Sequence, residues 1–521
     1  MQLNKGAIMV CGTNGKTTTN NVLAAALKES GASVVCNYAG ANMLSGIVSA
    51  LLPLARSGSS TDWAVLEVDE LSCAHTLPQI KPRYFVLLNL FRDQLDRAGE
   101  IDKIQEVIAT ALKKTPDTTL VVCGDDPLCM GVVERLSAHQ RESVKTASKE
   151  LASSVVAFGI GEETGVPADR VPEARFCQVC GAELNYIYRH YAQLGNYQCP
   201  NGDFVRPALN FSAQDVVLDK GGVDFKVSAS TGISADTGLS TGASVDTSFS
   251  TSTSADTVSS TITTSTSAHA NAKTNSKVTK KAPQQSLHVP FGGLYMVYNM
   301  LAAYAITALI GIPVKDFQHA VSTFHPDNGR LQSFNLQGQK VVLNLAKNPT
   351  GFNQNISLML ADPRPKHVFF VVNDNFNDGK DISWIWDVDF ERLTAQKDLT
   401  IFVGGTRAND LAVRMKYAGF GSVPIYLTAA EALTAMKDTT SDEALTETGD
   451  DSPENTGEPA KQPLYILTNY SALWPIKAEL EKMQKHRHKC EHHDQPQRMQ
   501  QHERKYEHPL EHEHQHQHEE A

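Results

Sequence analysis

The chain has 521 residues, 41% of them hydrophobic, with nine cysteines and a formal net charge of −11. This length predicts two or three domains with a substantial core, and the acidic balance argues against a nucleic-acid partner. The irregular cysteine spacing favours a reducing cytosol over a disulfide framework. No cationic leader with an apolar core precedes residue 10, so we expect no secretory signal.

A glycine-rich turn follows the first predicted strand, over residues 7–10. Residues 10–19 read VCGTNGKTTT and precede an Ala/Leu-rich segment typical of a helix. Glycines in such a turn let backbone N–H groups face an anion, and the helix N-terminus adds partial positive charge. The pattern predicts that Lys16 reaches the outer phosphates of ATP and that Thr17 binds Mg²⁺, although Val10 occupies the first glycine position of the general P-loop. The residues assigned to nucleotide binding are Gly12, Thr13, Asn14, Gly15, Lys16, Thr17 and Thr18.

Further apolar runs alternate with helical patterns through the first 170 residues, which predicts a parallel sheet covered by helices. The runs lie at residues 64–68, 84–90, 119–123 and 155–159. Because the carboxyl ends of parallel strands face the ligand crevice, Glu67 or Asp69 is placed to hold Mg²⁺ directly or through water. Asn89 opens a second polar run, which continues through Arg92, Asp93, Gln94 and Asp96. Singly, each of these could be an ordinary surface group; beside the glycine turn they indicate a phosphate-transfer site.

Residues 174–206 interrupt this alternation with Cys177, Cys180 and Cys199. A CxxC pair followed about twenty residues later by a second knuckle has the spacing of a zinc ribbon, with strands expected within 185–198. Residues 227–285 are Ser/Thr/Ala/Gly repeats, which predict a disordered insertion because they cannot bury enough apolar surface. The charge-free stretch 293–314 fits either a membrane span or a buried helix, and Asn299 with the lack of a positive flank favours the buried helix.

A second α/β unit is predicted from strand candidates at 341–345, 367–372, 400–403 and 464–467. An acidic segment at 438–461 is predicted to be a disordered loop. The His-rich tail over 484–521 is expected to be solvated, with loose binding of transition metals as the alternative. The expected domains are therefore residues 1–325, which bind ATP, and residues 326–483.

These motifs carry a family resemblance. GTNGKTT at 12–18, LEVDE at 66–70 and NLFRDQLDRAGE at 89–100 resemble the central ATPase domain of the Mur ligases, which join amino acids to the peptidoglycan stem peptide. LAKNPTGFNQ at 345–354, NDNFNDGKDISWIWDVDFE at 373–391 and GGTRANDL at 404–411 are similar to the narrower MurT family, the synthetase subunits of lipid II isoglutaminyl synthase. The resemblance implies a Mur ligase-like α/β ATPase domain with a parallel-rich sheet, an inserted zinc-ribbon-like module and a second α/β C-terminal domain.

The resemblance also implies an activity. MurT-type subunits use ATP and Mg²⁺ to activate the D-glutamate α-carboxylate of lipid II as an acyl phosphate, and ammonia then gives D-isoglutamine. The ammonia comes from a separate GatD-type glutamine amidotransferase subunit. We therefore expect a heterodimer with such a glutaminase, located in the cytoplasm and peripheral to the inner face of the plasma membrane, with a structural Zn²⁺.

Three site assignments follow from the resemblance. Asp381 matches the aspartate of the family's D-x-SW motif. In the family, this aspartate is proposed to complete the partner's Cys-His pair as a triad. The resemblance therefore implies that Asp381 is a catalytic residue, together with Lys16. The family ribbon carries four cysteines, and the fourth position is Gly202 here, so Asp203, water or another side chain would complete the zinc site. Asn299 is the polar candidate near the adenine, because Tyr295 and Met296 replace the usual His-Asn pair.

Two other functions compete with this interpretation. The first is a stand-alone Mur or folylpolyglutamate-type ligase that adds an amino acid, and the second is a non-catalytic scaffold that binds nucleotide and docks partners. The chain shows no convincing Cys-nucleophile motif, so we expect no glutaminase activity from it alone.

Overall fold

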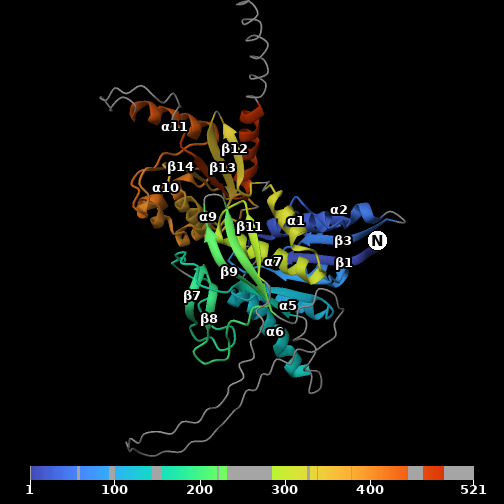
Figure 1. Cartoon of the computed structure of the whole chain (residues 1–521). Coiled ribbons are helices and arrows are strands. Elements are labelled where there is room, and N and C mark those ends of the chain that lie inside the picture. The colour runs from blue at the N-terminus through green and yellow to red at the C-terminus, as the bar shows by residue number, and fades with distance from the viewer. Residues whose placement is uncertain are drawn as a thin grey trace, which may run out of the picture.

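The computed structural model describes residues 2–55, 59–92, 100–143, 155–170, 172–219, 222–230, 284–325, 329–336, 338–376, 378–443 and 461–485. Within these ranges, a nine-stranded and a five-stranded sheet each form the centre of a helix-covered unit (Figure 1). A two-stranded hairpin lies beside the larger unit.

The larger sheet has the order β11-β10-β9-β6-β5-β4-β1-β3-β2. Its strands are β1 (Gln2–Cys11), β2 (Val34–Cys36), β3 (Ser60–Glu67), β4 (Tyr84–Leu87), β5 (Thr119–Cys123), β6 (Val155–Ile160), β9 (Phe211–Leu218), β10 (Val223–Ala229) and β11 (Gln285–Val289). Strands β1 to β6 pair in parallel, and β9 joins β6 in parallel. Strands β10 and β11 then continue the sheet by antiparallel pairing. All five strands predicted for this unit are confirmed.

Helices bury both faces of this sheet. On β1, Ile8 and Val10 face one helical layer, whereas Met9 and Cys11 face the other, as the two-residue period of a strand requires. The first layer contains α1 (Lys16–Glu29), α7 (Leu294–Ile310) and α8 (Val314–Ser322). The second contains α3 (Cys73–Ile80), α5 (Ile101–Lys113) and α6 (Pro127–Ser143). Helix α2 (Leu44–Leu51) lies next to edge strand β2 and its neighbour β3, and the short η1 (Leu52–Ala55) follows it in the chain.

The charge-free stretch at 293–314 is a buried helix, as predicted. Helix α7 packs against α1, and the residues at its centre have almost no solvent exposure. Among the described residues, no helix combines the length and apolarity needed to cross a bilayer.

The predicted ribbon strands are confirmed as β7 (Asn185–Tyr191) and β8 (Leu194–Gln198), which pair antiparallel between β6 and β9 in the chain. The smaller sheet has the order β12-β13-β16-β14-β15, parallel except for the β12–β13 hairpin. Its strands are β12 (Gln332–Leu336), β13 (Gln339–Leu345), β14 (Lys366–Val371), β15 (Leu399–Gly404) and β16 (Leu464–Thr468). All four strands predicted for the second unit are therefore present.

Helices also cover both faces of the smaller sheet. One layer contains α9 (Pro349–Ala361), η3 (Ser383–Asp387), η4 (Phe390–Ala395) and α10 (Ala408–Tyr417). The other contains α11 (Ala429–Glu443) and a helix over residues 470–485. The second unit is thus a complete α/β layer structure with its own core.

Several predicted boundaries shift. Strand β10 continues to Ala229 and β11 begins at Gln285, so both ends of the predicted 227–285 insertion are strand. Helix α11 continues to Glu443, inside the predicted 438–461 loop, and the last helix includes residues 484–485 of the predicted tail. The ends of these predicted disordered segments belong to neighbouring strands and helices, and amino-acid composition alone does not show where such an element ends. Residues 93–99, 231–283, 444–460 and 486–521 lie outside the described residues.

Candidate functional site

The glycine turn joins the end of β1 to the start of α1. Gly12 and Gly15 have φ values of 135° and 87°, in the region that glycine adopts without strain. A Cβ at Gly12 would lie 2.9 Å from the Asn89 carbonyl oxygen, and a Cβ at Gly15 would overlap the Asn299 amide. Both glycines are therefore required by backbone conformation and by close packing. In the described part of the chain, no side chain caps the N-terminus of α1, so its backbone N–H groups are available to bind an anion.

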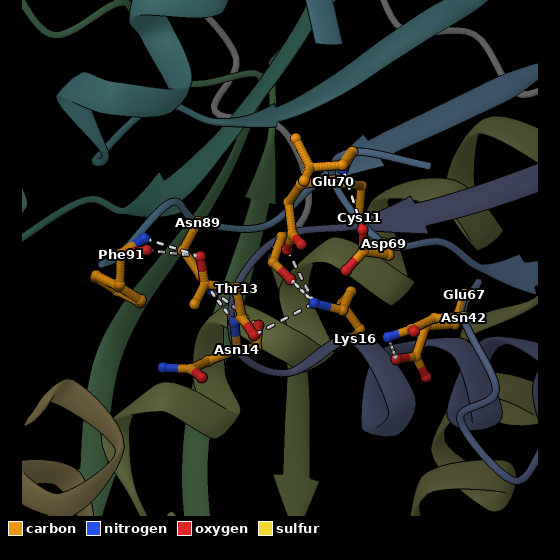
Figure 2. A network of polar contacts seen from close by, with 12 residues as sticks. Cys11, Thr13, Asn14, Lys16, Asn42, Glu67, Asp69, Glu70, Asn89 and Phe91 are labelled. Carbon is orange, nitrogen blue, oxygen red and sulfur yellow. Dashed lines mark hydrogen bonds and ion pairs between the residues drawn. The ribbon is translucent and has the colours of Figure 1, made fainter. Parts of the chain in front are cut away.

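Asn89 holds this turn in shape. Its Oδ1 accepts a hydrogen bond from the Asn14 backbone N–H at 2.8 Å, and its Nδ2 donates to the Asn14 carbonyl at 3.0 Å. The Thr13 hydroxyl accepts from the Phe91 backbone N–H at 2.9 Å (Figure 2). The segment after β4 thus positions the loop, and the described contacts of the Asn89 amide are to the loop backbone.

Lys16 is buried at the start of α1 and points into the turn (Figure 2). Its Nζ donates to the Gly12 carbonyl and forms an ion pair with Glu70 Oε1 at 2.9 Å. Burial alone would lower the pKa of Lys16, but Glu70 and Glu67 outweigh it and raise that pKa above its usual value. Lys16 is therefore a cation at neutral pH. Sequence reasoning missed Glu70, although it is the last acid of the LEVDE run.

Glu67 and Thr17 form a second polar group beside the turn. Glu67 ends β3, is 2% exposed, and accepts a hydrogen bond at Oε1 from Asn42 Nδ2 at 3.0 Å. Its Oε2 has no hydrogen-bond partner among the described residues. A Cβ at Gly40 would lie 3.1 Å from Thr17 Oγ1 and 3.4 Å from Glu67 Oε2, so both oxygens border one small space. A buried carboxylate oxygen without a donor is costly, and it fits Mg²⁺ together with a hydroxyl.

The other predicted carboxylate, Asp69, has a different environment. Its Oδ1 accepts a hydrogen bond from the Leu71 backbone N–H at 3.1 Å, and its backbone N–H donates to the Asn42 carbonyl at 2.9 Å. Of the two alternatives, Glu67 is the one with an oxygen left for a cation.

A pocket opens between the turn and the second unit. Asn14, Gly15, Thr18 and Asn299, which are four of the residues assigned to nucleotide binding, line it from the first unit, and Arg330 lines it from the linker to the second. Arg330 Nη2 donates to Thr17 Oγ1 at 3.3 Å and brings a second cation to the turn.

Asn348 is a second contact between the units at this pocket. Asn14 Nδ2 donates to Asn348 Oδ1 at 3.3 Å, and the same Oδ1 accepts from the Gly351 backbone N–H at 2.8 Å to cap α9. Sequence reasoning gave Arg330 and Asn348 no role, although Asn348 lies in the LAKNPTGFNQ segment that carried the family resemblance.

The predicted zinc ligands come together at the base of the hairpin. The ligand atoms of Cys177, Cys180, Cys199 and Asp203 all lie within 4.8 Å of one another. Asp203 Oδ1 is 3.6 Å from the Sγ atoms of both Cys177 and Cys180, and Cys180 Sγ is 3.4 Å from Cys199 Sγ. Gly202 adopts φ 76° in the turn, and Asp203 rather than residue 202 reaches the thiols. Three thiols and one carboxylate fit a tetrahedral zinc site.

Two family models match the chain. Residues 10–171 match the Mur ligase middle domain, and residues 345–473 match the MurT ligase C-terminal domain. The chain is 30% identical over 412 residues to lipid II isoglutaminyl synthase (glutamine-hydrolyzing) subunit MurT of Staphylococcus aureus (strain COL). The aligned region covers 79% of this chain and 77% of that protein. The chain belongs to the MurT family.

Further similarities agree with this family. The MurT subunit of Streptococcus pneumoniae (strain ATCC BAA-255 / R6) is 29% identical over 416 residues, with 79% of this chain and 77% of that protein covered. A pseudomurein peptide ligase type C from Methanothermus fervidus superposes with a TM-score of 0.55 at 16% identity, covering 92% of this chain and 79% of that one. The last similarity supports the fold alone, and it confirms the predicted Mur ligase-like architecture.

In this MurT-family chain, Asp381 lies on the surface of the second unit, just before η3. Its Oδ1 accepts a hydrogen bond from the Ser383 backbone N–H at 2.8 Å, which holds the pKa of the carboxyl below its usual value. Phe376 is 96% exposed, and Trp386 is 47% exposed with its ring 5.5 Å from that of Tyr417. The structure thus places an ionised carboxylate at the surface, in a segment of the chain that also exposes two aromatic side chains.

Arg92 connects this surface segment to the strand end that shapes the turn. Its Nη2 lies 3.1 Å from Asp387 Oδ2 of η3, and Phe91, the residue before it, contacts Thr13. The predicted residues Asp93, Gln94 and Asp96 lie outside the described residues.

Proposed function

We propose that this chain is the ATP-dependent synthetase subunit that amidates the D-glutamate α-carboxylate of lipid II to D-isoglutamine in peptidoglycan synthesis. The observation that carries the proposal is the cradle of Lys16, Thr17 and Glu67, with its unpaired buried oxygen, in a chain similar along most of its length to MurT subunits. Binding of ATP at this cradle supplies the phosphoryl group that the reaction consumes.

The chemistry requires an activated carboxyl group. A substrate carboxylate oxygen attacks the γ-phosphorus, and the bond from that phosphorus to the bridging oxygen of ADP breaks. Ammonia then attacks the acyl carbon of the acyl phosphate, inorganic phosphate leaves, and the nitrogen loses a proton.

The residues of the cradle match this chemistry. The Lys16 cation and the N–H groups of the turn stabilise negative charge on the transferred phosphoryl group, and Arg330 is placed to add a second cation. Thr17 and Glu67 would hold Mg²⁺, which neutralises phosphate charge when bound.

Ammonia would come from a GatD-type glutamine amidotransferase subunit. Asp381 is exposed and ionised, as a group must be to hydrogen-bond the histidine of a partner's Cys-His pair. Exposed aromatic side chains such as Trp386 and Phe376 are common anchors of protein interfaces. In this proposal the glutaminase binds to the surface segment that exposes Asp381, Phe376 and Trp386.

An assay of the purified chain separates this function from a stand-alone amino-acid ligase. With lipid II, ATP, Mg²⁺ and free ammonium, we expect ADP release together with conversion of one carboxyl group to an amide, detected by mass spectrometry of the muropeptide. With glutamine in place of ammonium, the chain alone is expected to give no product. A product that forms only when an amino acid is added would overturn the proposal in favour of the stand-alone ligase.

We also propose that Cys177, Cys180, Cys199 and Asp203 hold a structural Zn²⁺. Asp203→Ala is expected to weaken zinc retention against a chelator by at least about tenfold, because it removes one of four ligands. Metal content measured by mass spectrometry and the thermal unfolding midpoint with and without chelator are the readouts. Asp203→Cys is expected to retain zinc, and Glu183→Ala, an exposed acid in the same module, is the matched control. Equal zinc retention by wild type and Asp203→Ala would show that Asp203 is not a ligand.

A further inference from the structure

Helix α2 and the residues beside it expose an unusual number of large apolar side chains. Tyr38, Met43, Leu44, Val48 and Leu52 are between 40% and 65% exposed, and we call these five residues the α2 patch. Leu44, Val48 and Leu52 are spaced four residues apart and therefore share one face, whereas Ile47 is buried against the core. The outward face of this helix thus carries these aliphatic side chains beside the exposed Ser45 and Ser49.

The patch is also free of charge. No Asp, Glu, Lys or Arg occurs between Glu29 and Arg56. Lys28 borders it, with its ammonium 4.7 Å from the centre of the Tyr38 ring. Because no ionised side chain belongs to the patch, moving the patch out of water does not require the desolvation of a charge. Tyr38 and the neighbouring Lys28 each combine an apolar body with a polar end, which suits the boundary between an apolar and an aqueous phase.

The α2 patch begins at the phosphate site. Asn42, next to Met43, donates to Glu67 Oε1 at 3.0 Å, and its carbonyl accepts from the Asp69 backbone N–H at 2.9 Å. From there α2 extends for eight residues, which is about 12 Å. Helix α2 lies at the outer edge of the larger unit, on the side away from the second unit (Figure 1). An apolar phase in contact with the patch would therefore lie within a short distance of Glu67 and Thr17.

We propose that the α2 patch is a docking surface for a lipid bilayer, which presents the headgroup of a lipid-anchored substrate to the phosphate site. This inference rests on the proposed function, because a lipid-anchored substrate requires the site to approach the membrane. Burial of apolar side chains in the interface drives this binding, since the net charge of −11 opposes attraction to an anionic surface. The contact is therefore reversible and depends little on salt.

The test uses the full chain and vesicles of phosphatidylglycerol and phosphatidylethanolamine in a flotation assay. The triple variant Leu44→Gln, Val48→Gln, Leu52→Gln is expected to bind vesicles at least about tenfold more weakly than wild type, since three aliphatic side chains no longer leave water. The control variant Ile187→Gln, Val217→Gln removes apolar side chains that are 65% and 55% exposed elsewhere, and is expected to bind like wild type.

Activity separates docking from catalysis. The triple variant is expected to lose about tenfold or more of its amidation of vesicle-embedded lipid II, and to keep wild-type ATP binding and wild-type amidation of detergent-dispersed lipid II. Equal vesicle binding by wild type and triple variant, no binding by wild type, or binding that high salt abolishes would each overturn the inference. So would a wild-type dimer that the triple variant converts to monomer, because the patch would then be a self-interface. If the wild-type protein fails to bind ATP, the proposed function is refuted. The vesicle-binding comparison would still test whether the α2 patch docks on a bilayer, because it does not depend on ATP.

Discussion

Lys16→Ala is expected to lower the rate of ATP-dependent amidation by a factor of about 10³ or more. The Lys16 ammonium is buried in the turn and is held as a cation by Glu70 and Glu67. Its removal leaves the negative charge that develops on the transferred phosphoryl group without its nearest amine. Steady-state release of ADP and phosphate with saturating ammonium measures the effect.

The same variant also removes the partner of Glu70, whose side chain is only 13% exposed. An unpaired carboxylate in this position destabilises the fold, so thermal unfolding should accompany the kinetics, and the double variant Lys16→Ala, Glu70→Gln removes the unpaired charge. Lys28→Ala, an exposed lysine on the same helix, is the matched control. Turnover by a folded Lys16→Ala protein within tenfold of wild type would show that ATP is used elsewhere. Loss of turnover with an intact partner complex would exclude the scaffold alternative.

Asp381→Asn is expected to separate the two nitrogen sources. In the complex with the glutaminase subunit, glutamine-dependent amidation should fall by roughly 10³- to 10⁴-fold, because an amide neither orients the partner histidine in the same tautomer nor stabilises its cation. Amidation driven by free ammonium should remain at the wild-type rate, since Asp381 lies on an exposed segment and is not among the residues lining the pocket at the turn. Parallel assays with glutamine and with ammonium on one preparation provide the measurement.

Asp387→Asn is the control for this experiment. Asp387 is an exposed acid on η3 and pairs with the partly exposed Arg92, an interaction worth little in solvent. We expect both nitrogen sources to be used normally by this variant. If Asp381→Asn reduces ammonium-driven and glutamine-driven amidation equally, or reduces neither, Asp381 does not act through the partner's histidine.

Much of the fold followed from local sequence. The nine strands predicted for the two large sheets are mostly buried on both faces, so they occur as continuous apolar runs that sequence reveals directly. Five strands of the two sheets were missed, and they are different: β2 has three residues, whereas β9, β10, β11 and β12 mix buried with partly or fully exposed positions. Such short or half-exposed strands resemble loops in composition.

The site divided in the same way. The turn at Gly12 and Gly15, the carboxylate Glu67 and the cluster around Cys177 were all predictable, because each depends on residue types at fixed local spacing. Asn89 was predicted at the site, but its contacts with the backbone of Asn14 were not. The spacing of residues in the sequence identifies which chemical groups are available, but it does not identify the residues that these groups contact.

By itself, the sequence determined the glycine turn between β1 and α1, the two α/β units, the zinc-ribbon spacing and the family. Only the tertiary structure decided that Glu70 pairs with Lys16, that Arg330 and Asn348 of distant segments reach the turn, and that Asp203 approaches the three thiols. The physical reason is that backbone conformation and burial follow from near neighbours in the chain, whereas an ion pair or a ligand set depends on how separate elements pack.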